Sequence, residues 1–195
     1  MTVSKTRMGQ TRYTKFMTLP NFGVLSVDDG VDTNTTFIDN DNSNSRVGLT
    51  MTQALQNGSE LRLTFEAGLG LTGSSAINGS DDSLDVDYHR TELRKLELAY
   101  RTPNAGIFSF GQGSTSTDGS AEADFSRTGV AAYVGISDIA GSQLLRFADG
   151  SLSSVAIGDT NGSFDGSRRF RVRYDTPVFN GFSASVSYGQ EGLSS

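Results

Sequence analysis

The side chains that could perform acid–base or nucleophilic chemistry are few and scattered along the chain. His89 is the only histidine, and there is no cysteine. The sequence therefore lacks the residues for a cysteine–histidine nucleophile–base pair and for a metal site built from several histidines. Glu122 and Asp124 could imitate the paired carboxylates of a glycosidase, but two acids in a polar loop define no catalytic geometry. The sequence therefore indicates a protein that is not an enzyme, and we expect His89 to be a solvated loop residue.

One short segment has the residue types of a calcium loop. Asp39, Asp41 and Ser43 stand at alternate positions, as oxygen ligands do at the start of such a loop. Asn44 then occupies the position of the usual glycine, and Thr50 occupies the position of the bidentate acid. We therefore expect no resident cofactor, and a loosely bound surface calcium ion is the one exception that the sequence leaves open.

Composition and charge exclude further classes of function. The chain has 195 residues, a formal net charge of −6, 35% hydrophobic residues and 23 glycines. Its acids gather in presumed loops, so we expect no nucleic-acid partner. Low apolar content with many glycines suits short strands joined by polar loops rather than a helical core. No stretch approaches the roughly 18 uninterrupted apolar residues of a membrane-spanning helix.

The elements that must position the charged residues are β-strands, because hydrophobic residues recur with a period of two. In residues 60–71 the odd positions are Leu, Leu, Phe, Ala, Leu and Leu, and the even positions are polar, charged or glycine. Such alternation places the two sets on opposite faces of a strand. The same pattern, with turn residues between the segments, predicts further strands in 46–52, 95–101, 108–110, 169–174 and 182–188, and a weaker one in 22–27.

The predicted strands are joined alternately by tight turns and by long polar loops. One apolar face, one polar face and this asymmetry are typical of outer-membrane barrels, although a soluble β-sandwich also alternates. The longest interruption, residues 113–165, far exceeds ordinary loop lengths. It contains enough apolar residues, such as Tyr133, Ile136 and Phe147, to pack against the rest of the protein, so we expect it to be ordered.

Several of these segments together resemble the general porins of Gram-negative bacteria, especially those of alphaproteobacteria. The resemblance covers most of the chain after Val24. Its segments are residues 28–30, 45–49, 94–100, 110–113 with 117–124, and 168–177. It implies an all-β protein, an antiparallel transmembrane β-barrel of the 16-stranded porin type, of which this chain would supply about the first seven strands and a long constriction loop.

The resemblance also implies a function and a location. Such porins are homotrimers in the bacterial outer membrane, in contact with lipid and lipopolysaccharide, and they let ions and small hydrophilic solutes diffuse passively through a water-filled channel. We accordingly expect residues 21–195 to form a partial porin barrel, with residues 113–165 folded inward as the constriction loop. Residues 1–20 carry four basic residues without the apolar core of a secretory signal, and we treat them as an atypical N-terminal segment.

In this family acidic groups on the inward loop face a basic cluster on the barrel wall, and the field between them sets ion preference. The matching acidic candidates are Asp118, Glu122 and Asp124. Strand parity selects the basic wall candidates, which are Arg46, Arg62, Lys95, Arg101, Arg169, Arg171 and Arg173. The last three stand at alternate positions and would repel one another unless water or carboxylates compensate them.

Two other functions fit the pattern. The first is a secreted or surface β-structured binding protein of the adhesin kind, whose polar face contacts a partner. The second is a truncated porin without channel activity of its own. Detergent dependence separates a porin from a soluble sandwich, because only the sandwich covers its own apolar face.

Overall fold

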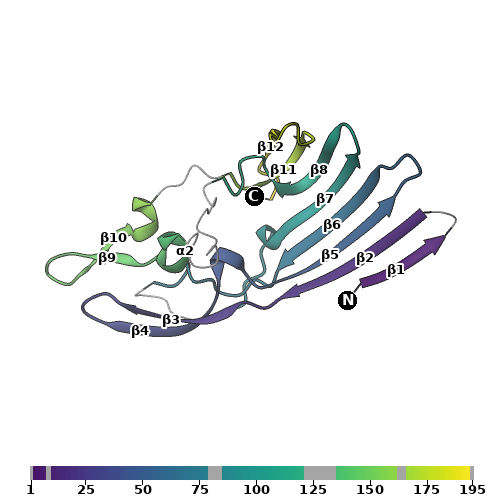
Figure 1. The fold of residues 1–195 in the computed structure, drawn as a ribbon. Coiled ribbons are helices and arrows are strands. Elements are labelled where there is room, and N and C mark those ends of the chain that lie inside the picture. Colours follow the sequence, from purple (N-terminus) through teal and green to yellow (C-terminus); the bar gives the residue numbers. More distant parts are fainter. Residues whose placement is uncertain (1, 8–9, 79–84, 121–134, 162–165, 194–195) are drawn as a thin grey trace.

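A computed structural model describes residues 2–7, 10–78, 85–120, 135–161 and 166–193 of the chain. Its main element is an antiparallel sheet of eight strands in the order β1-β2-β5-β6-β7-β8-β11-β12. The strands are β1 (Thr2–Arg7), β2 (Gln10–Leu19), β5 (Arg46–Ala54), β6 (Glu60–Gly68), β7 (Leu93–Thr102), β8 (Gly106–Ser114), β11 (Arg168–Asp175) and β12 (Ser185–Gln190). The sheet is curved and open, a partial barrel (Figure 1), so the predicted fold class is confirmed.

The strands of the sheet differ from the predicted set at its N-terminal side. β1 and β2 were not predicted as strands, and β2 lies inside the sheet, paired with β5. Apolar and polar residues mix on both faces of β2, where Tyr13 and Lys15 share one face and Thr14 and Phe16 share the other. Residues 22–28 do form a strand, as predicted, but it lies outside the main sheet.

Two small hairpins lie beyond one end of the main sheet (Figure 1). β3 (Phe22–Asp28) pairs with β4 (Thr33–Asp39), and β9 (Leu144–Arg146) pairs with β10 (Leu152–Ala156). The short helices are η1 (Asp41–Ser43), η2 (Arg90–Glu92), α2 (Ile136–Ala140) and η3 (Ile157–Thr160). α2 contacts η1, which follows β4, and η3, which follows β10, whereas η2 directly precedes β7. Arg146 of β9 joins the two hairpins, because its guanidinium bonds Asp29 in the turn after β3, with 2.7 Å between Nη2 and Oδ2.

The connections at the two ends of the sheet are unequal. At one end, β5 and β6 are joined through residues 55–59, and β7 and β8 through 103–105. The β11–β12 turn passes through Asn180 and Gly181, both at positive φ, as tight hairpin turns require. All the long segments, which carry β3–β4, η2 and β9–β10, leave from the opposite end, called the loop end below.

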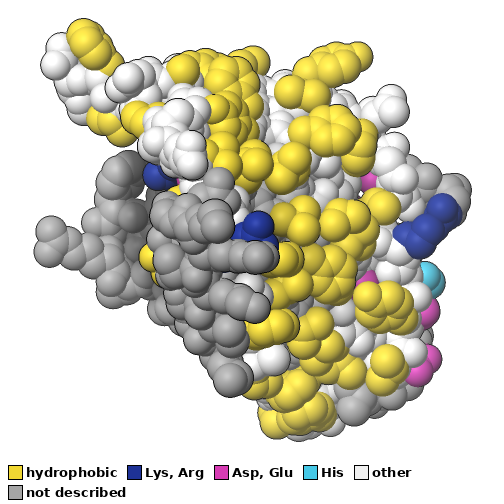
Figure 2. Space-filling view, turned by 90° about the vertical axis from the view of Figure 1, so that its right-hand side faces the viewer, with side chains coloured by type: hydrophobic (Ala, Val, Ile, Leu, Met, Phe, Trp, Pro, Cys, Tyr) yellow, Lys and Arg dark blue, Asp and Glu magenta, His cyan; other side chains and the backbone are white. Residues whose placement is uncertain are grey.

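Register gives the sheet one apolar and one polar face. The apolar face carries large exposed hydrophobic side chains: Phe16, Val47, Met51, Leu63, Phe65, Leu96, Leu98, Phe108, Phe110, Phe170, Val172, Val186 and Tyr188. Figure 2 shows how widely hydrophobic side chains spread over the surface. Within the described chain the only buried hydrophobic residues are Ile38, Ala67 and Ile77. The sheet therefore has no conventional core of its own.

Candidate functional site

The polar face of the sheet collects the charged residues. Strand register aligns its residues in lines across β6, β7, β8 and β11. One line holds Thr64, Glu97, Gly111 and Arg171, and the next holds Arg62, Ala99, Ser109 and Arg173. On the loop side of these lines, Glu66 pairs with Lys95 and Gly113 pairs with Arg169. All seven basic residues selected from the sequence lie on this face, since Arg46 pairs with Gly68 and Arg101 pairs with Glu60. The polar face is therefore the candidate site.

Arg171 lies flat within this face and is 4% exposed. Its Nη2 contacts Oε2 of Glu97 at 2.5 Å, its Nε donates to the carbonyl of Ser114 at 2.9 Å, and its Nη1 donates to the carbonyl of Gly111. Gly111 stands between Arg171 and Glu97 in the register. Gly113 leaves room for the guanidinium, because a Cβ there would lie 2.9 Å from Nη2 of Arg171 and 2.6 Å from Oε2 of Glu97. Arg171 is therefore part of the wall and presents little surface to solvent.

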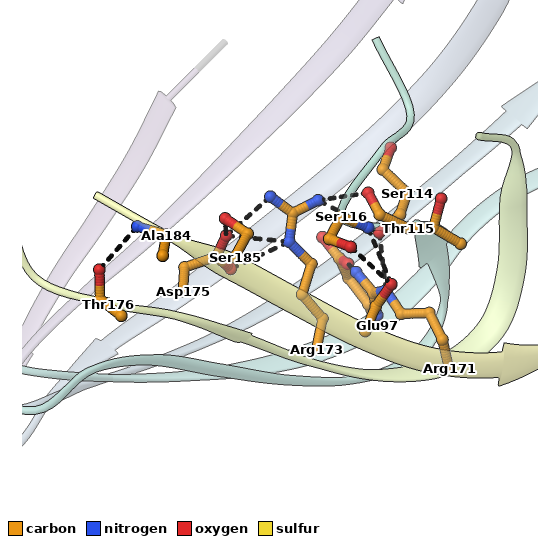
Figure 3. Close-up of polar contacts among 11 residues, drawn as sticks. Glu97, Ser114, Thr115, Ser116, Arg171, Arg173, Asp175, Thr176, Ala184 and Ser185 are labelled. Atoms are coloured by element: carbon orange, nitrogen blue, oxygen red, sulfur yellow. Dashed lines mark hydrogen bonds and ion pairs between the residues drawn. The ribbon is translucent and has the colours of Figure 1, made fainter. Parts of the chain in front are cut away.

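Arg173, in the next line, connects the wall to the start of the long segment after β8 (Figure 3). Its Nε and Nη2 bond the carboxylate of Asp175, the latter at 2.7 Å. Its Nη1 donates to the carbonyl of Thr115 at 2.6 Å and to that of Ser114 at 3.4 Å. Because Ser114 pairs with Arg168 in the register, these bonds show that the chain folds back over the polar face after β8.

The predicted repulsion among Arg169, Arg171 and Arg173 is offset by carboxylates, one for each arginine. Arg169 contacts Glu191 at 2.6 Å, and the other two contact Glu97 and Asp175. These carboxylates come from the wall itself and from the segment after β12.

A second basic cluster lies at the loop end of the polar face, around Glu66. Glu66 is 8% exposed, and its Oε1 contacts Nε of Arg94 at 2.8 Å and Nε of Arg46 at 3.6 Å. Arg168 is close enough to interact electrostatically with Arg46, Arg94, Glu66 and Asp118. Three guanidinium groups therefore surround two carboxylates in the described part of this cluster.

Selecting basic residues by alternate positions in the sequence missed Arg94 and Arg168. Arg94 lies at a register irregularity between β6 and β7, which turns its side chain to the polar face. Arg168 is the first residue of β11, where the side chain can bend around the strand end. The available signal was the motif itself, because both arginines open segments that carried the family resemblance.

The remaining predicted basic residues are more exposed. Arg62 contacts Glu60 on its own strand at 2.9 Å, and their side chains are 44% and 31% exposed. Lys95 lies next to Glu66 in the register, and Arg101 is exposed. These side chains face solvent on the polar side of the sheet.

The acidic candidates are only partly described. Asp118 is half-buried, and its backbone N–H donates to the carbonyl of Thr115 within a turn. Glu122 and Asp124 lie outside the described residues. An opposition between these two acids and the basic wall therefore stays a prediction.

The long loop predicted at 113–165 has two described parts, and they lie in different places. Gly113 and Ser114 still belong to β8, and residues 115–117 lie against the polar face. Residues 135–160 instead lie with the β3–β4 hairpin beyond the loop end, where the Gln143 amide donates to the carbonyl of Ile77 at 3.0 Å (Figure 1). Residues 121–134 and 162–165 lie outside the described residues, and the inward fold of the whole segment stays a prediction.

The residues singled out for calcium binding act as hydrogen-bond acceptors at the base of the hairpins. Asp39 is 2% exposed, and its carboxylate accepts bonds from the backbone N–H and the hydroxyl of Ser45. Asp41 accepts from the backbone N–H of Ser75 at 2.8 Å. The part of the chain that the structure describes contains no group of three or more His, Asp or Glu residues arranged to hold a metal ion.

His89 contacts Asp87 at 2.8 Å, and both side chains are 68% exposed. It is therefore a solvated residue, as predicted. It is the residue that precedes η2.

Comparison with known proteins adds one match. A family model described as Gram-negative porin matches residues 20–195. No curated protein and no solved structure matches the chain. Among the residues that the structure describes, no helix is long and apolar enough to cross a membrane.

Proposed function

The chain belongs to the family of Gram-negative porins, and from that premise we propose that it forms the wall of a water-filled channel in the bacterial outer membrane. Ions and small hydrophilic solutes would diffuse through this channel passively, without a chemical reaction or a cofactor. The observation that carries the proposal is the division of one curved antiparallel sheet into an apolar face and a polar face lined with charge.

The apolar face supports contact with lipid. Its side chains are large, hydrophobic and about half exposed, as for Leu98 at 47% and Val172 at 55%. No other described element covers this face, so in water its exposure would cost free energy, at roughly 25 cal/mol per Å². Hydrocarbon removes that cost, and strands paired on both sides leave no unsatisfied backbone groups in the membrane.

The charges of the polar face support the proposal that this face lines a water-filled lumen. Arginines of β11 form ion pairs with carboxylates of β7 and β11, and such a charged wall tunes passage by electrostatics rather than by catalysis. We propose that the segment after β8 narrows the lumen, with Asp118, Glu122 and Asp124 opposite the basic wall. The contacts of residues 115–117 with the polar face support this role.

The assembly that we propose follows the family. It is a homotrimer of 16-stranded barrels in contact with outer-membrane lipid and lipopolysaccharide. The openness of the eight-stranded sheet supports the need for further strands, because unpaired strand edges in lipid cost several kcal/mol for each unsatisfied backbone group.

Planar-bilayer conductance tests the proposal. The protein is refolded in detergent and added to one side of a bilayer, and we expect stepwise current increases of uniform size. The matched control is the variant Leu63→Arg, which carries a charge on the apolar face and should insert poorly.

A protein that folds in detergent but gives no current would be a porin without channel activity. A monomer that folds stably without detergent would instead contradict the porin function and favour a soluble binding protein, since its apolar face would then be covered by the protein itself.

A further inference from the structure

We infer that Arg173 is a positioning residue that clamps the root of the long segment, residues 115–117, onto the polar face and so fixes how far that segment narrows the channel. The inference rests on the proposed function and assigns one side chain to its control. No contact with a solute is required of Arg173.

The first evidence is the direction of the chain after β8. Ser114 pairs with Arg168 at the start of β11, whereas Arg173 lies five positions further along the same strand. Arg173 nevertheless donates to the carbonyls of Ser114 and Thr115. The chain therefore turns in over the polar face, and the residues before β11 turn with it, because the Thr115 N–H donates to the carbonyl of Ser167 at 3.3 Å and the Gly166 N–H donates to the carbonyl of Thr117 at 3.1 Å.

The second evidence is the way in which the Arg173 guanidinium is held. Asp175 accepts bonds from Nε at 3.0 Å and from Nη2 at 2.7 Å, and the Ser185 hydroxyl donates to the same carboxylate at 2.6 Å. This arrangement fixes the plane of the guanidinium and leaves Nη1 directed at Thr115 (Figure 3). A planar, fixed donor set of this kind is what distinguishes arginine from lysine.

A second contact lies beside the first. The backbone N–H of Ser116 donates to the hydroxyl of Ser187 at 2.9 Å, and the two serine hydroxyl oxygens are 3.1 Å apart. Ser187 pairs with Arg173 in the β11–β12 register. Two successive loop residues are therefore held at one position on the wall.

The chemistry of the clamp suits a permanent anchor. Arg173 binds backbone carbonyls, so the contact does not depend on which side chains the loop carries. A charged donor strengthens such bonds relative to neutral ones. Arg173 and Asp175 are each 23% exposed, so the surrounding water screens their interaction only in part.

The experiment compares Arg173→Gln, Arg173→Lys and the control Arg62→Gln. Arg62 is matched to Arg173, because it lies in the same line of the polar face and contacts a carboxylate two residues away on its own strand. The chain has no native cysteine, so Thr115→Cys provides a single thiol for labelling by a maleimide in detergent, at a half-buried residue whose hydroxyl oxygen is buried. We expect Arg173→Gln to raise the labelling rate at least several-fold, Arg62→Gln to leave it unchanged, and Arg173→Lys to restore part of the protection.

A disulfide provides a second measurement that does not rely on the loss of Arg173. Ser116→Cys combined with Ser187→Cys should form a disulfide on mild oxidation, because the two hydroxyl oxygens are in contact. The disulfide should restore slow labelling of a Thr115→Cys variant that also carries Arg173→Gln. Failure of the cysteine pair to cross-link, or equal labelling rates for Arg173→Gln and Arg62→Gln, would overturn the clamp.

Conductance separates this inference from the proposed function. If channels form, Arg173→Gln should change the single-channel conductance, and Arg62→Gln should change it less. If no variant conducts while labelling and cross-linking follow the expected pattern, the channel function fails and the clamp stands. If channels form but labelling and conductance are the same in Arg173→Gln and Arg62→Gln, the clamp fails and the channel function stands.

Discussion

Arg171 and Glu97 form an ion pair across an intervening strand. Arg171 belongs to β11 and Glu97 to β7, and β8 lies between them with Gly111 at the register position that separates the two side chains. The contact of 2.5 Å between Nη2 and Oε2 passes over β8 beside Gly113, where a Cβ would lie 2.6 Å from Oε2 of Glu97 and 2.9 Å from Nη2 of Arg171. A charge that the sequence marks as pore-lining is therefore used to join three strands of the wall.

Replacement of Glu97 by leucine should destabilise the fold by about 3 kcal/mol, because the Arg171 side chain is 3% exposed and would be left as an unpaired buried cation. The measurement is the free energy of unfolding by urea in detergent. Glu60→Leu is the matched control, since it removes the carboxylate of an exposed Arg62 pair, and should cost no more than about 1 kcal/mol. Equal losses for the two variants would contradict a structural role for the Arg171–Glu97 pair.

Gly111→Ala should be more destabilising than Gly181→Ala, although both glycines have positive φ, 115° and 85°. A Cβ at Gly111 would lie 2.3 Å from the carbonyl oxygen of Leu96, whereas a Cβ at Gly181 meets no atom within 4 Å. We expect Gly181→Ala to cost about 1 kcal/mol for its backbone conformation alone, and Gly111→Ala a further 1–3 kcal/mol, roughly, for the overlap. Unfolding in urea compares the two, and similar midpoints would show that β7 and β8 can move apart.

Alternation alone predicted most of the sheet and its polar face. Leu61, Leu63 and Phe65 stand opposite Arg62 and Thr64 in the sequence as they do in the structure. The pattern works there because both faces have a uniform environment. It fails in β2, where both faces are mixed. In 22–28 it correctly predicts a strand, but alternation does not show that this strand pairs in a separate hairpin.

The partners of the basic residues were not predictable from the sequence. Parity placed Arg171 and Arg173 on the polar face, but the contacts of Arg171 with Glu97 and of Arg173 with Thr115 depend on register across two strands and on a reversal of the chain. Neither the register between strands nor a reversal of the chain produces a periodic pattern in the sequence. Arg94 was missed for a related reason, because a single register irregularity reverses the parity on which the selection relied.

The contact between the two loop hairpins should be lost in acid. The hydrogen bond from Arg146, together with backbone N–H groups of Asp32 and Val31, lowers the pKa of Asp29 from 3.8 to about 2. A carboxyl whose pKa is lowered in the folded state contributes stability in full above its unfolded pKa, and that contribution falls as the pH drops. The β3–β4 and β9–β10 hairpins should therefore separate as the pH falls from 3.8 to about 2.

Amide hydrogen exchange in the two hairpins measures this transition. Asp29→Asn should remove the pH dependence in that window and should raise exchange in β9 and β10 already at neutral pH. Asp32→Asn is the control, because its side chain is 79% exposed and lies 3.3 Å from Arg146, so its loss should have a smaller effect. Protection that is independent of pH down to 2 in the unmodified chain would contradict the role of the Asp29–Arg146 bond.

The strongest test of the two faces uses neighbouring residues of one strand. Leu63 and Thr64 are adjacent in β6, and Leu63 pairs with Met51 and Leu98 on the apolar face, whereas Thr64 pairs with Thr50 and Glu97 on the polar face. Leu63→Arg should lower the stability of the protein in lipid vesicles by about 2–4 kcal/mol, because the charge would lie in hydrocarbon. Thr64→Arg adds the same charge beside a carboxylate and should change stability by less than about 1 kcal/mol. Folding yield in vesicles, measured with urea unfolding, compares the two variants. If both arginines were tolerated equally, the apolar face would not contact lipid, and the assignment of the polar face to a water-filled lumen would fail with it.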